Sequence, residues 1–501
     1  ARLTVRGFKD ADAQEMSAFS GTASRWAQRI VVSEAVARGW PLLSVDVAKA
    51  FLQGVTYEEL AEMTGRPQRE VNFTLPPASL EVLRRIPEFS SCDASSEVFH
   101  KPGTGLRDAP QAFSTKLRKV IGSCSFRASV VQPELELKHE SRQLIALLCK
   151  HVDDIKMTGQ RDAILHVIRA LEAVFGKLEI QWHTFTNCGV HHVQDPSTFE
   201  VTLDQTAFIA ACKPICSPEV SGAAADKPIE GALFTQFFSL LMTIAFATIT
   251  RIDLAIYIAA LQKAASKACM IHVRRLNALV RWAQRNPKAL TYRRLPQYPD
   301  AFVLISDAAF KADGDTGLSM RGAVHVRTIG RKFCVGRVPM HFIDHAARSQ
   351  RHVTRATFSS ELFAATDAVD TGVIQRIALH ELQHGAVSNT VARSILDGST
   401  RSSIALALVV DALSVHAAVT ASNVKVPADQ SLVVHIRWIR PLLDSGVLAH
   451  MVWVDTRDML ADALTKGAID REAIHSAMDG TWVISHQPKF WASALAARRA
   501  L

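Results

Sequence analysis

Glycine and proline are scarce in this chain, with 24 Gly and 19 Pro among 501 residues, and we find no internal repeat or low-complexity tract. This composition excludes collagen-like, solenoid and largely disordered chains. Hydrophobic residues make up 48% and charged residues 21%, which is ordinary for a folded protein. The length allows two or three domains, each with a core of its own, so one active site need not account for the whole chain.

Closely spaced pairs of cysteines are also missing. Only Cys212 and Cys216 lie near each other, and no second ligand pair accompanies them, so the pattern of a structural zinc site is absent. His191 and His192 are adjacent and are expected to form a loop pair rather than metal ligands. The scattered thiols indicate a reduced, intracellular protein.

The chain has a formal charge of +9 and a pI near 9.2, which favours an anionic partner. Residues 1–6 lack the apolar segment of a secretion signal. Residues 231–250 are uncharged, but they include Gln236 and are followed at once by Arg251 and Asp253. We therefore expect a buried helix there and no membrane association.

Three acidic residues stand where strands are expected to end. The apolar run 41–47 includes Asp46, and residues 144–149 and 155–158 predict two strands joined by a turn that carries Asp153 and Asp154. Transfer of a nucleotide to a 3′-hydroxyl needs two divalent ions held by clustered carboxylates. An Asp-Asp pair alone is more often a solvated turn, so its sequence context has to decide between the two interpretations.

That context resembles one family. Residues 44–54 read Ser-Val-Asp-Val-Ala-Lys-Ala-Phe-Leu-Gln-Gly, residues 105–113 read Gly-Leu-Arg-Asp-Ala-Pro-Gln-Ala-Phe, and residues 151–154 read His-Val-Asp-Asp. In this order they resemble the palm motifs of copia-type reverse transcriptases, the last being similar to a Tyr-Val-Asp-Asp box. Residues 1–8 look like the fingers strand of that family, cut at its start.

The resemblance implies roles for single residues. Asp46, Asp153 and Asp154 would hold the polymerase metals, and Phe51 would be the steric gate that rejects a 2′-hydroxyl. A plain core position for this phenylalanine is the alternative. Arg2 would bind the triphosphate, and Thr104 stands where a residue would contact the incoming nucleotide. His151 in place of Tyr, and Thr104 itself, depart from the family pattern.

A second acidic set follows the cluster of Pro287, Pro296 and Pro299, which marks a linker. The set comprises Asp307 after a strand at 302–306, Glu361 near the start of a helix, Asp411 after a strand at 407–410, and Asp462 in residues 461–466 (Ala-Asp-Ala-Leu-Thr-Lys). Together these resemble the four metal-binding acids of a copia-type RNase H domain. Residues 430–433 (Gln-Ser-Leu-Val) depart from the Lys-His-Ile-Asp that this family shows.

Residues 250–255 (Thr-Arg-Ile-Asp-Leu-Ala) also resemble that family, so the likeness covers nearly the whole chain. The predicted class is α/β (α+β). We expect truncated fingers and palm at 1–215, a helical thumb or connection at 216–298, an RNase H-like domain at 299–482 and a tail at 483–501.

The resemblance implies a fragment of a retrotransposon Pol polyprotein with two activities, RNA-directed DNA polymerase and RNase H. Its cofactors would be Mg²⁺ or Mn²⁺, two ions per active site. Its partners would be an RNA template, a DNA primer, RNA/DNA hybrid, dNTPs and other segments of a longer polyprotein. The location would be a cytoplasmic particle or the nucleus. Two alternatives stay open: a decayed remnant that binds nucleic acid without turnover, and an RNase H with an inert palm.

Overall fold

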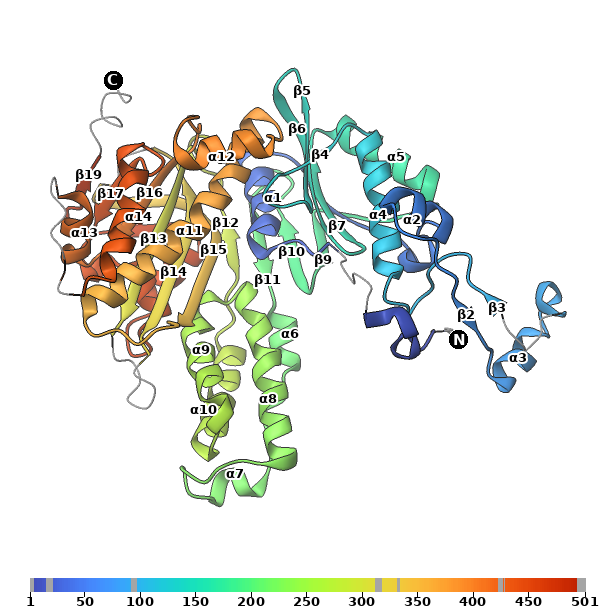
Figure 1. The fold of residues 1–501 in the computed structure, drawn as a ribbon. Coiled ribbons are helices and arrows are strands. Elements are labelled where there is room, and N and C mark those ends of the chain that lie inside the picture. Colours follow the sequence, from blue (N-terminus) through green and yellow to red (C-terminus); the bar gives the residue numbers. More distant parts are fainter. Residues whose placement is uncertain are drawn as a thin grey trace.

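A computed structural model describes residues 4–14, 21–91, 97–310, 318–330, 334–421, 427 and 429–492. The predicted α/β class is confirmed, because helices and several sheets alternate along the chain. Figure 1 shows two sheet-containing regions side by side, with a bundle of helices extending below them. Arg2 lies outside the described residues.

The first sheet has six strands in the order β4-β5-β6-β7-β1-β8. Its strands are β1 (Leu42–Asp46), β4 (Arg127–Ala128), β5 (Leu135–Glu140), β6 (Gln143–His151), β7 (Asp154–Gly159) and β8 (Glu179–Trp182). Both faces are covered, since Leu43 and Leu148 pack with α4 (Ala109–Ser123) and α5 (Arg161–Phe175), whereas Leu42 and Leu147 pack with α1 (Arg25–Arg38). Burial on both faces explains why residues 144–149 of the central strand β6 are a continuous apolar run in the sequence.

A smaller lobe precedes α4 in the chain. It contains the 3₁₀ helix η3 (Ala50–Leu52), the helices α2 (Tyr57–Thr64) and α3 (Pro77–Leu83), and the strand pair β2 (Asn72–Phe73) and β3 (Glu97–Val98). Helix α2 begins with a capping box in which the side chains of Thr56 and Glu59 each accept a backbone hydrogen bond. In Figure 1 this lobe lies at the end of the molecule far from the last strands.

A four-stranded sheet in the order β12-β11-β10-β9 links the first sheet to the helical region. Its strands are β9 (Thr184–Asn187), β10 (Val190–Gln194), β11 (Val201–Asp204) and β12 (Leu290–Tyr292). The expectation of a loop at His191 and His192 is wrong, because both lie in β10 and His192 is buried. The surrounding polar residues hide the strand alternation in the sequence.

The middle of the chain is helical. It consists of α6 (Thr206–Ala211), α7 (Pro218–Gly222), α8 (Gly231–Phe246), α9 (Ala255–Ala264) and α10 (Met270–Arg285), which share one apolar cluster. Arg251 and Asp253, buried between these helices, form an ion pair with an N–O distance of 2.8 Å. Pairing is what allows both charges to be buried.

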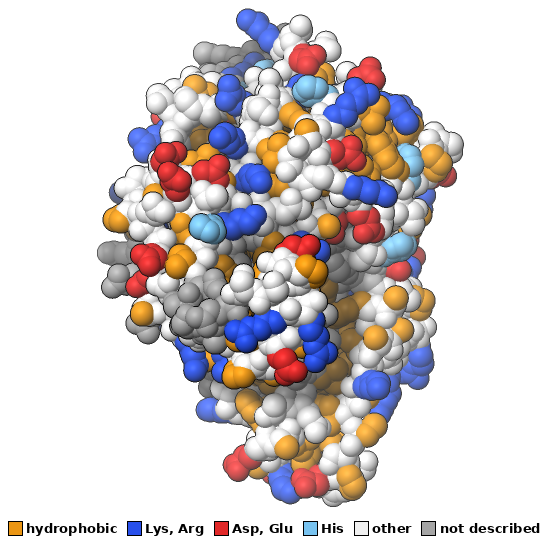
Figure 2. All heavy atoms as spheres, turned by 90° about the vertical axis from the view of Figure 1, so that its right-hand side faces the viewer, with side chains coloured by type: hydrophobic (Ala, Val, Ile, Leu, Met, Phe, Trp, Pro, Cys, Tyr) orange, Lys and Arg blue, Asp and Glu red, His pale blue; other side chains and the backbone are white. Residues whose placement is uncertain are grey.

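The expectation that residues 231–250 form a buried helix is wrong in one respect. The segment Gly231–Ile249 is long and apolar enough by composition to cross a membrane, yet only 28% of its apolar window is buried inside the protein. Leu241 and Ile244 pack inward, whereas Phe238 and Met242 are exposed. Hydrophobic side chains accordingly show over the lower part of the face drawn in Figure 2. A uniformly apolar sequence gives no sign of which face is exposed.

The third sheet has seven strands in the order β18-β15-β14-β13-β16-β17-β19. They are β13 (Ala301–Ala309), β14 (Met320–Thr328), β15 (Gly336–Ser349), β16 (Ala405–Val410), β17 (His450–Trp453), β18 (Thr481–Ile484) and β19 (Lys489–Trp491). The helices around it are α11 (Thr357–His384), α12 (Asn389–Asp397), α13 (Leu413–Thr420), α14 (Leu432–Asp444) and α15 (Glu472–Met478). Helix α11 packs along β13, where Gly372 lies against Leu304 so closely that a Cβ there would stand 2.3 Å from its Cδ1.

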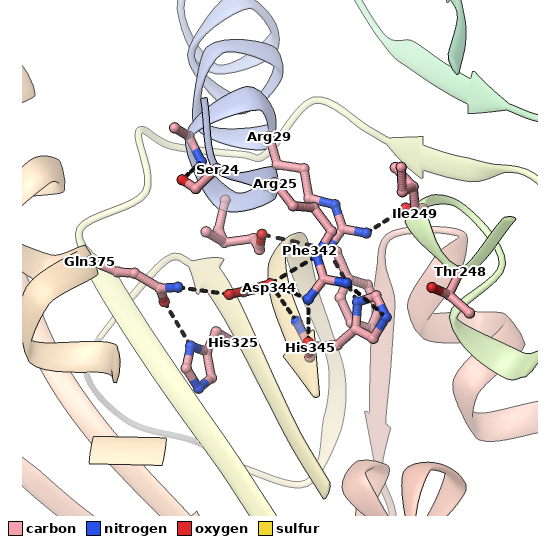
Figure 3. Close-up of polar contacts among 12 residues, drawn as sticks. Ser24, Arg25, Arg29, Thr248, Ile249, His325, Phe342, Asp344, His345 and Gln375 are labelled. Carbon is pink, nitrogen blue, oxygen red and sulfur yellow. Dashed lines mark hydrogen bonds and ion pairs between the residues drawn. The ribbon is translucent and has the colours of Figure 1, made fainter. Parts of the chain in front are cut away.

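Helix α1 connects the first sheet to the third. Its Arg25 donates to Asp344 Oδ1 of β15 through Nε at 3.0 Å and Nη2 at 2.6 Å, and Gln375 of α11 donates to Asp344 Oδ2 at 2.9 Å. Arg29 donates to the carbonyl of Ile249 at 2.5 Å, as Figure 3 shows. Apolar residues of α1 and β15 also belong to one core cluster. The two sheet regions are therefore packed as one body.

Candidate carboxylate centres

The first centre lies where β1 ends and the β6–β7 hairpin turns. Asp46 is directly opposite Asp154 in the antiparallel pair of β1 and β7, so both side chains point to the same face of the sheet. His151 pairs with Asp154 across the hairpin, which leaves Val152 and Asp153 as the turn. The structure thus brings together the three acids predicted for this centre.

The hairpin turn is strained at Val152. Its φ of 63° lies in the left-handed region, which a β-branched residue rarely adopts. Its amide donates to the carbonyl of Gly21 at 3.2 Å, and Thr22 forms a bridge with His151. These contacts hold the turn in place, and strain of this kind is common at functional sites.

Negative charge accumulates at the first centre. The pKa of Asp46 is raised, first by partial burial and then by the charges of Asp153, Asp154 and Glu179. A bound divalent cation would relieve this repulsion, and oxygen ligands of this kind suit Mg²⁺ or Mn²⁺. The donor set therefore fits the expected metal.

A buried lysine beneath this centre was missed by the sequence analysis. Lys156 stands two residues after Asp154 on the same face of β7, and its Nζ lies 3.0 Å from Nε2 of His192. The His192 Nδ1 lies 2.9 Å from the carbonyl of Val190, so a neutral ring can donate there and accept from the ammonium. Burial lowers the pKa of Lys156 to about 8 and that of His192 well below its usual range.

The other predicted residues of this centre take different positions. Phe51 lies in η3, is half-buried and packs against the apolar cluster that contains Val45 and Val47. Thr104 is half-buried before α4, and its carbonyl accepts from the amide of Val5 at 2.9 Å. Arg2 lies outside the described residues. The roles of all three in substrate binding stay predictions.

The second centre lies at the ends of parallel strands. Strands β13 and β16 run parallel, with Ile305 opposite Val409. Asp307 and Asp411, each two residues further along, therefore lie at the same edge of the sheet. One carboxylate oxygen each from Asp307, Glu361 and Asp411 lies within 4.8 Å of the others. The three acids come from β13, from α11 and from the residue after β16.

Asp462 and Lys466 complete this centre. Asp462, in the 3₁₀ helix η9 (Leu460–Leu464), is close enough to Asp307 to raise its pKa and lies 2.6 Å from Nζ of Lys466. The hydroxyl of Thr465 donates to Asp307 Oδ2, and Lys466 Nζ lies 3.7 Å from Asp307 Oδ1. All four acids of the second predicted set therefore meet in one place, together with a lysine that partly balances them.

Burial and mutual repulsion raise the pKa of every acid in the second centre. Desolvation and then Asp462 raise the pKa of Asp307 to about 6, and desolvation and then Asp307 raise that of Glu361 to about 9. The pKa values of Asp411 and Asp462 are raised as well, mainly by burial. Perturbation on this scale is typical of functional sites.

One buried atom tests whether the second centre fits a metal. Asp307 Oδ1 accepts no hydrogen bond from the described residues, although the side chain is fully buried. A buried carboxylate oxygen without a hydrogen bond costs free energy that the ion pair with Lys466 at 3.7 Å only partly offsets, and a cation among the four acids would satisfy it. The residues present therefore fit a divalent ion.

Comparison with known proteins finds two related Pol polyproteins. The chain is 24% identical over 492 residues to the retrovirus-related Pol polyprotein from transposon RE2 of Arabidopsis thaliana, and 23% identical over 493 residues to that from transposon RE1. Each alignment covers 93% of the chain. The predicted resemblance to copia-type Pol polyproteins is confirmed. The chain spans 29% of the length of these two Pol polyproteins, and no protein-family model matches it.

Proposed function

We propose that this chain is the reverse transcriptase and RNase H region of a copia-type Pol polyprotein. The observation that carries the proposal is the presence of two separate carboxylate centres in one chain related to such polyproteins. Residues 1–215 would form the fingers and palm, 216–298 the thumb or connection, and 299–482 the RNase H-like domain, followed by a tail at 483–501. The substrates would be an RNA template, a DNA primer, dNTPs and RNA/DNA hybrid.

Two divalent ions in each centre would lower the pKa of the attacking oxygen and neutralise charge on the leaving oxygen. Asp46, Asp153 and Asp154 would hold the ions of the first centre. Asp307, Glu361, Asp411 and Asp462 would hold those of the second. The strand ends and the hairpin fix the first set of carboxylates, and the sheet edge fixes the second, so little reorganisation accompanies the reaction.

Phe51 would select the sugar. It follows the β1 strand that carries Asp46, and a ring beside the bound nucleotide would leave no room for a 2′-hydroxyl. We expect Phe51→Val to increase ribonucleotide incorporation at least tenfold relative to dNTP incorporation, measured by single-nucleotide primer extension. Unchanged sugar discrimination in an active variant would assign Phe51 to the core instead.

A nucleic-acid partner is favoured by the net charge of +9. Lys and Arg side chains are scattered over the face in Figure 2 rather than gathered into one patch there. Binding through many phosphate contacts depends steeply on salt concentration. We therefore expect the affinity for RNA/DNA hybrid to fall about 10³-fold between 50 and 200 mM salt if several phosphates are contacted.

The proposal is tested on the full chain with Mg²⁺ or Mn²⁺, by primer extension on an RNA template and by cleavage of labelled RNA in a hybrid. Both activities are expected, and both should disappear on chelation. Hybrid binding without either activity would favour the second candidate, a remnant without turnover. The departures at Thr104, His151 and residues 430–433 are the observations behind that candidate.

A further inference from the structure

A small cavity lies at the far end of the third sheet from the second centre. It has a volume of about 70 Å³ and is lined by residues before β16, by residues after α14 and by Arg376 of α11. Asp411 follows the other end of β16, so about six residues of strand, roughly 20 Å, separate the two places. The cavity is large enough for several waters or one small ion.

Arg376 is the unusual feature of this cavity. Its side chain is only 4% exposed, and one guanidinium nitrogen, Nη1, donates to the carbonyl of Val447. Its Nε has no hydrogen-bond partner among the described residues. Burial lowers the pKa of this arginine to about 10, and no acidic group acts to raise it. Within the described part of the chain, this buried charge thus has no carboxylate to balance it.

The rest of the lining offers donors and no acid. Thr400, Ser402 and Ser403 supply hydroxyl groups, and Arg401 adds an exposed guanidinium. The Ser403 hydroxyl lies 3.3 Å from Nδ1 of His380, which helps to fix its position. No Asp or Glu is among the lining residues. A tetrahedral oxyanion has the acceptors that match these donors.

We propose that this cavity binds a single phosphate group, with Arg376 as its buried counter-ion. Burying a guanidinium without a counter-ion is unfavourable, and an anion held by charge-assisted hydrogen bonds would offset that cost. The volume of about 70 Å³ suits one phosphate rather than a polynucleotide backbone. The phosphate is either a free ion or the phosphate of a mononucleotide. The proposal does not depend on either enzymatic activity.

The test compares the wild-type chain with Arg376→Met, and with Arg393→Met as a control because Arg393 is exposed on neighbouring α12. Calorimetric titration with inorganic phosphate should give a Kd in the millimolar range or below for the wild type and for Arg393→Met. We expect binding to Arg376→Met to be at least tenfold weaker. A parallel titration with AMP separates the two sources. A lower Kd for AMP than for inorganic phosphate would identify a mononucleotide, and a Kd for AMP that is not lower would identify the free ion.

Unfolding in urea at constant ionic strength gives a second readout. Phosphate at ten times its Kd should lower the unfolding constant of the wild type about eleven-fold. General salting effects of phosphate act equally on both variants, so the difference between them isolates the site. Arg376→Met also loses the donor to the Val447 carbonyl, so the readout is the stabilisation by phosphate within each variant rather than the stability without phosphate. If phosphate stabilises the wild type and Arg376→Met alike, the arginine is structural and the proposal is wrong.

Discussion

At the scale of single residues, each set of acids lies together, and Lys156 is buried beside the first set. Asp46 and Asp307 could be predicted because motif and strand end coincide at each. Lys156 was missed although it lies two residues after Asp154, because its partner His192 is 36 residues away and no local pattern links them. A buried polar pair of this kind becomes visible only when the sheets are packed together.

Lys156→Met should tighten cation binding at the first centre. The ammonium lies beneath Asp154 and repels an incoming divalent ion, and methionine keeps the length without the charge. We expect Mn²⁺ binding about tenfold tighter, equivalent to about 1.4 kcal/mol, measured by electron paramagnetic resonance in an Asp411→Asn background. The exposed Lys177 provides the matched control, Lys177→Met. Equal affinities in the two variants would show that Lys156 only fills space.

At the scale of elements, strands with a clear apolar run were predicted and those with polar inner faces were not. The expected strands at 144–149 and 302–306 became β6 and β13. Strand β15 was missed because His341, Asp344 and His345 are polar and point toward α1, where both histidines are buried and Asp344 is half-buried. When the buried side chains of a strand are polar, the apolar–polar alternation that indicates a strand is lost. Such a sequence resembles that of a surface loop.

The strain at Val152 in the β6–β7 turn can be tested by substitution. Val152→Gly should raise the free energy of unfolding by about 0.5–1 kcal/mol, because glycine adopts the positive φ without strain. The same change at Val174, exposed in α5, should lower it, because glycine disfavours a helix. Urea denaturation of both variants measures this. A loss of stability at both positions would mean that the turn is not strained.

At the scale of the whole molecule, α1 fixes the two centres relative to each other. Glu34 and Arg327 form a buried ion pair with an N–O distance of 2.7 Å, and Ser33 Oγ lies 2.9 Å from Nδ1 of His341. The prolines at 287, 296 and 299 predict a linker between the two regions, and the local sequence shows no more than that. It could not foresee this interface, because contacts between residues some 300 positions apart leave no local pattern in a single sequence.

This interface should lose stability in acid. Burial, and to a smaller extent Arg327, lower the folded-state pKa of His341 to about 4 from 6.5, while the hydrogen bond with the carbonyl of Arg293 and, less strongly, Glu34 oppose the shift. The unfolded chain therefore binds the proton first, and stability that is present above pH 6.5 is lost as the pH falls toward 4, by up to about 3 kcal/mol. His341→Gln should reduce this slope, measured by urea denaturation from pH 7 to 4. An unchanged slope would contradict a buried neutral histidine.

The most direct test of the whole account is whether the two activities can be removed one at a time. Asp153→Asn and Asp411→Asn each keep the side-chain shape and remove a charge that metal binding needs. Primer extension and hybrid cleavage are measured for both, with circular dichroism to confirm folding. The account predicts that Asp153→Asn lowers extension by orders of magnitude and spares cleavage, and that Asp411→Asn does the reverse. Loss of both activities in each folded variant would contradict two separate centres.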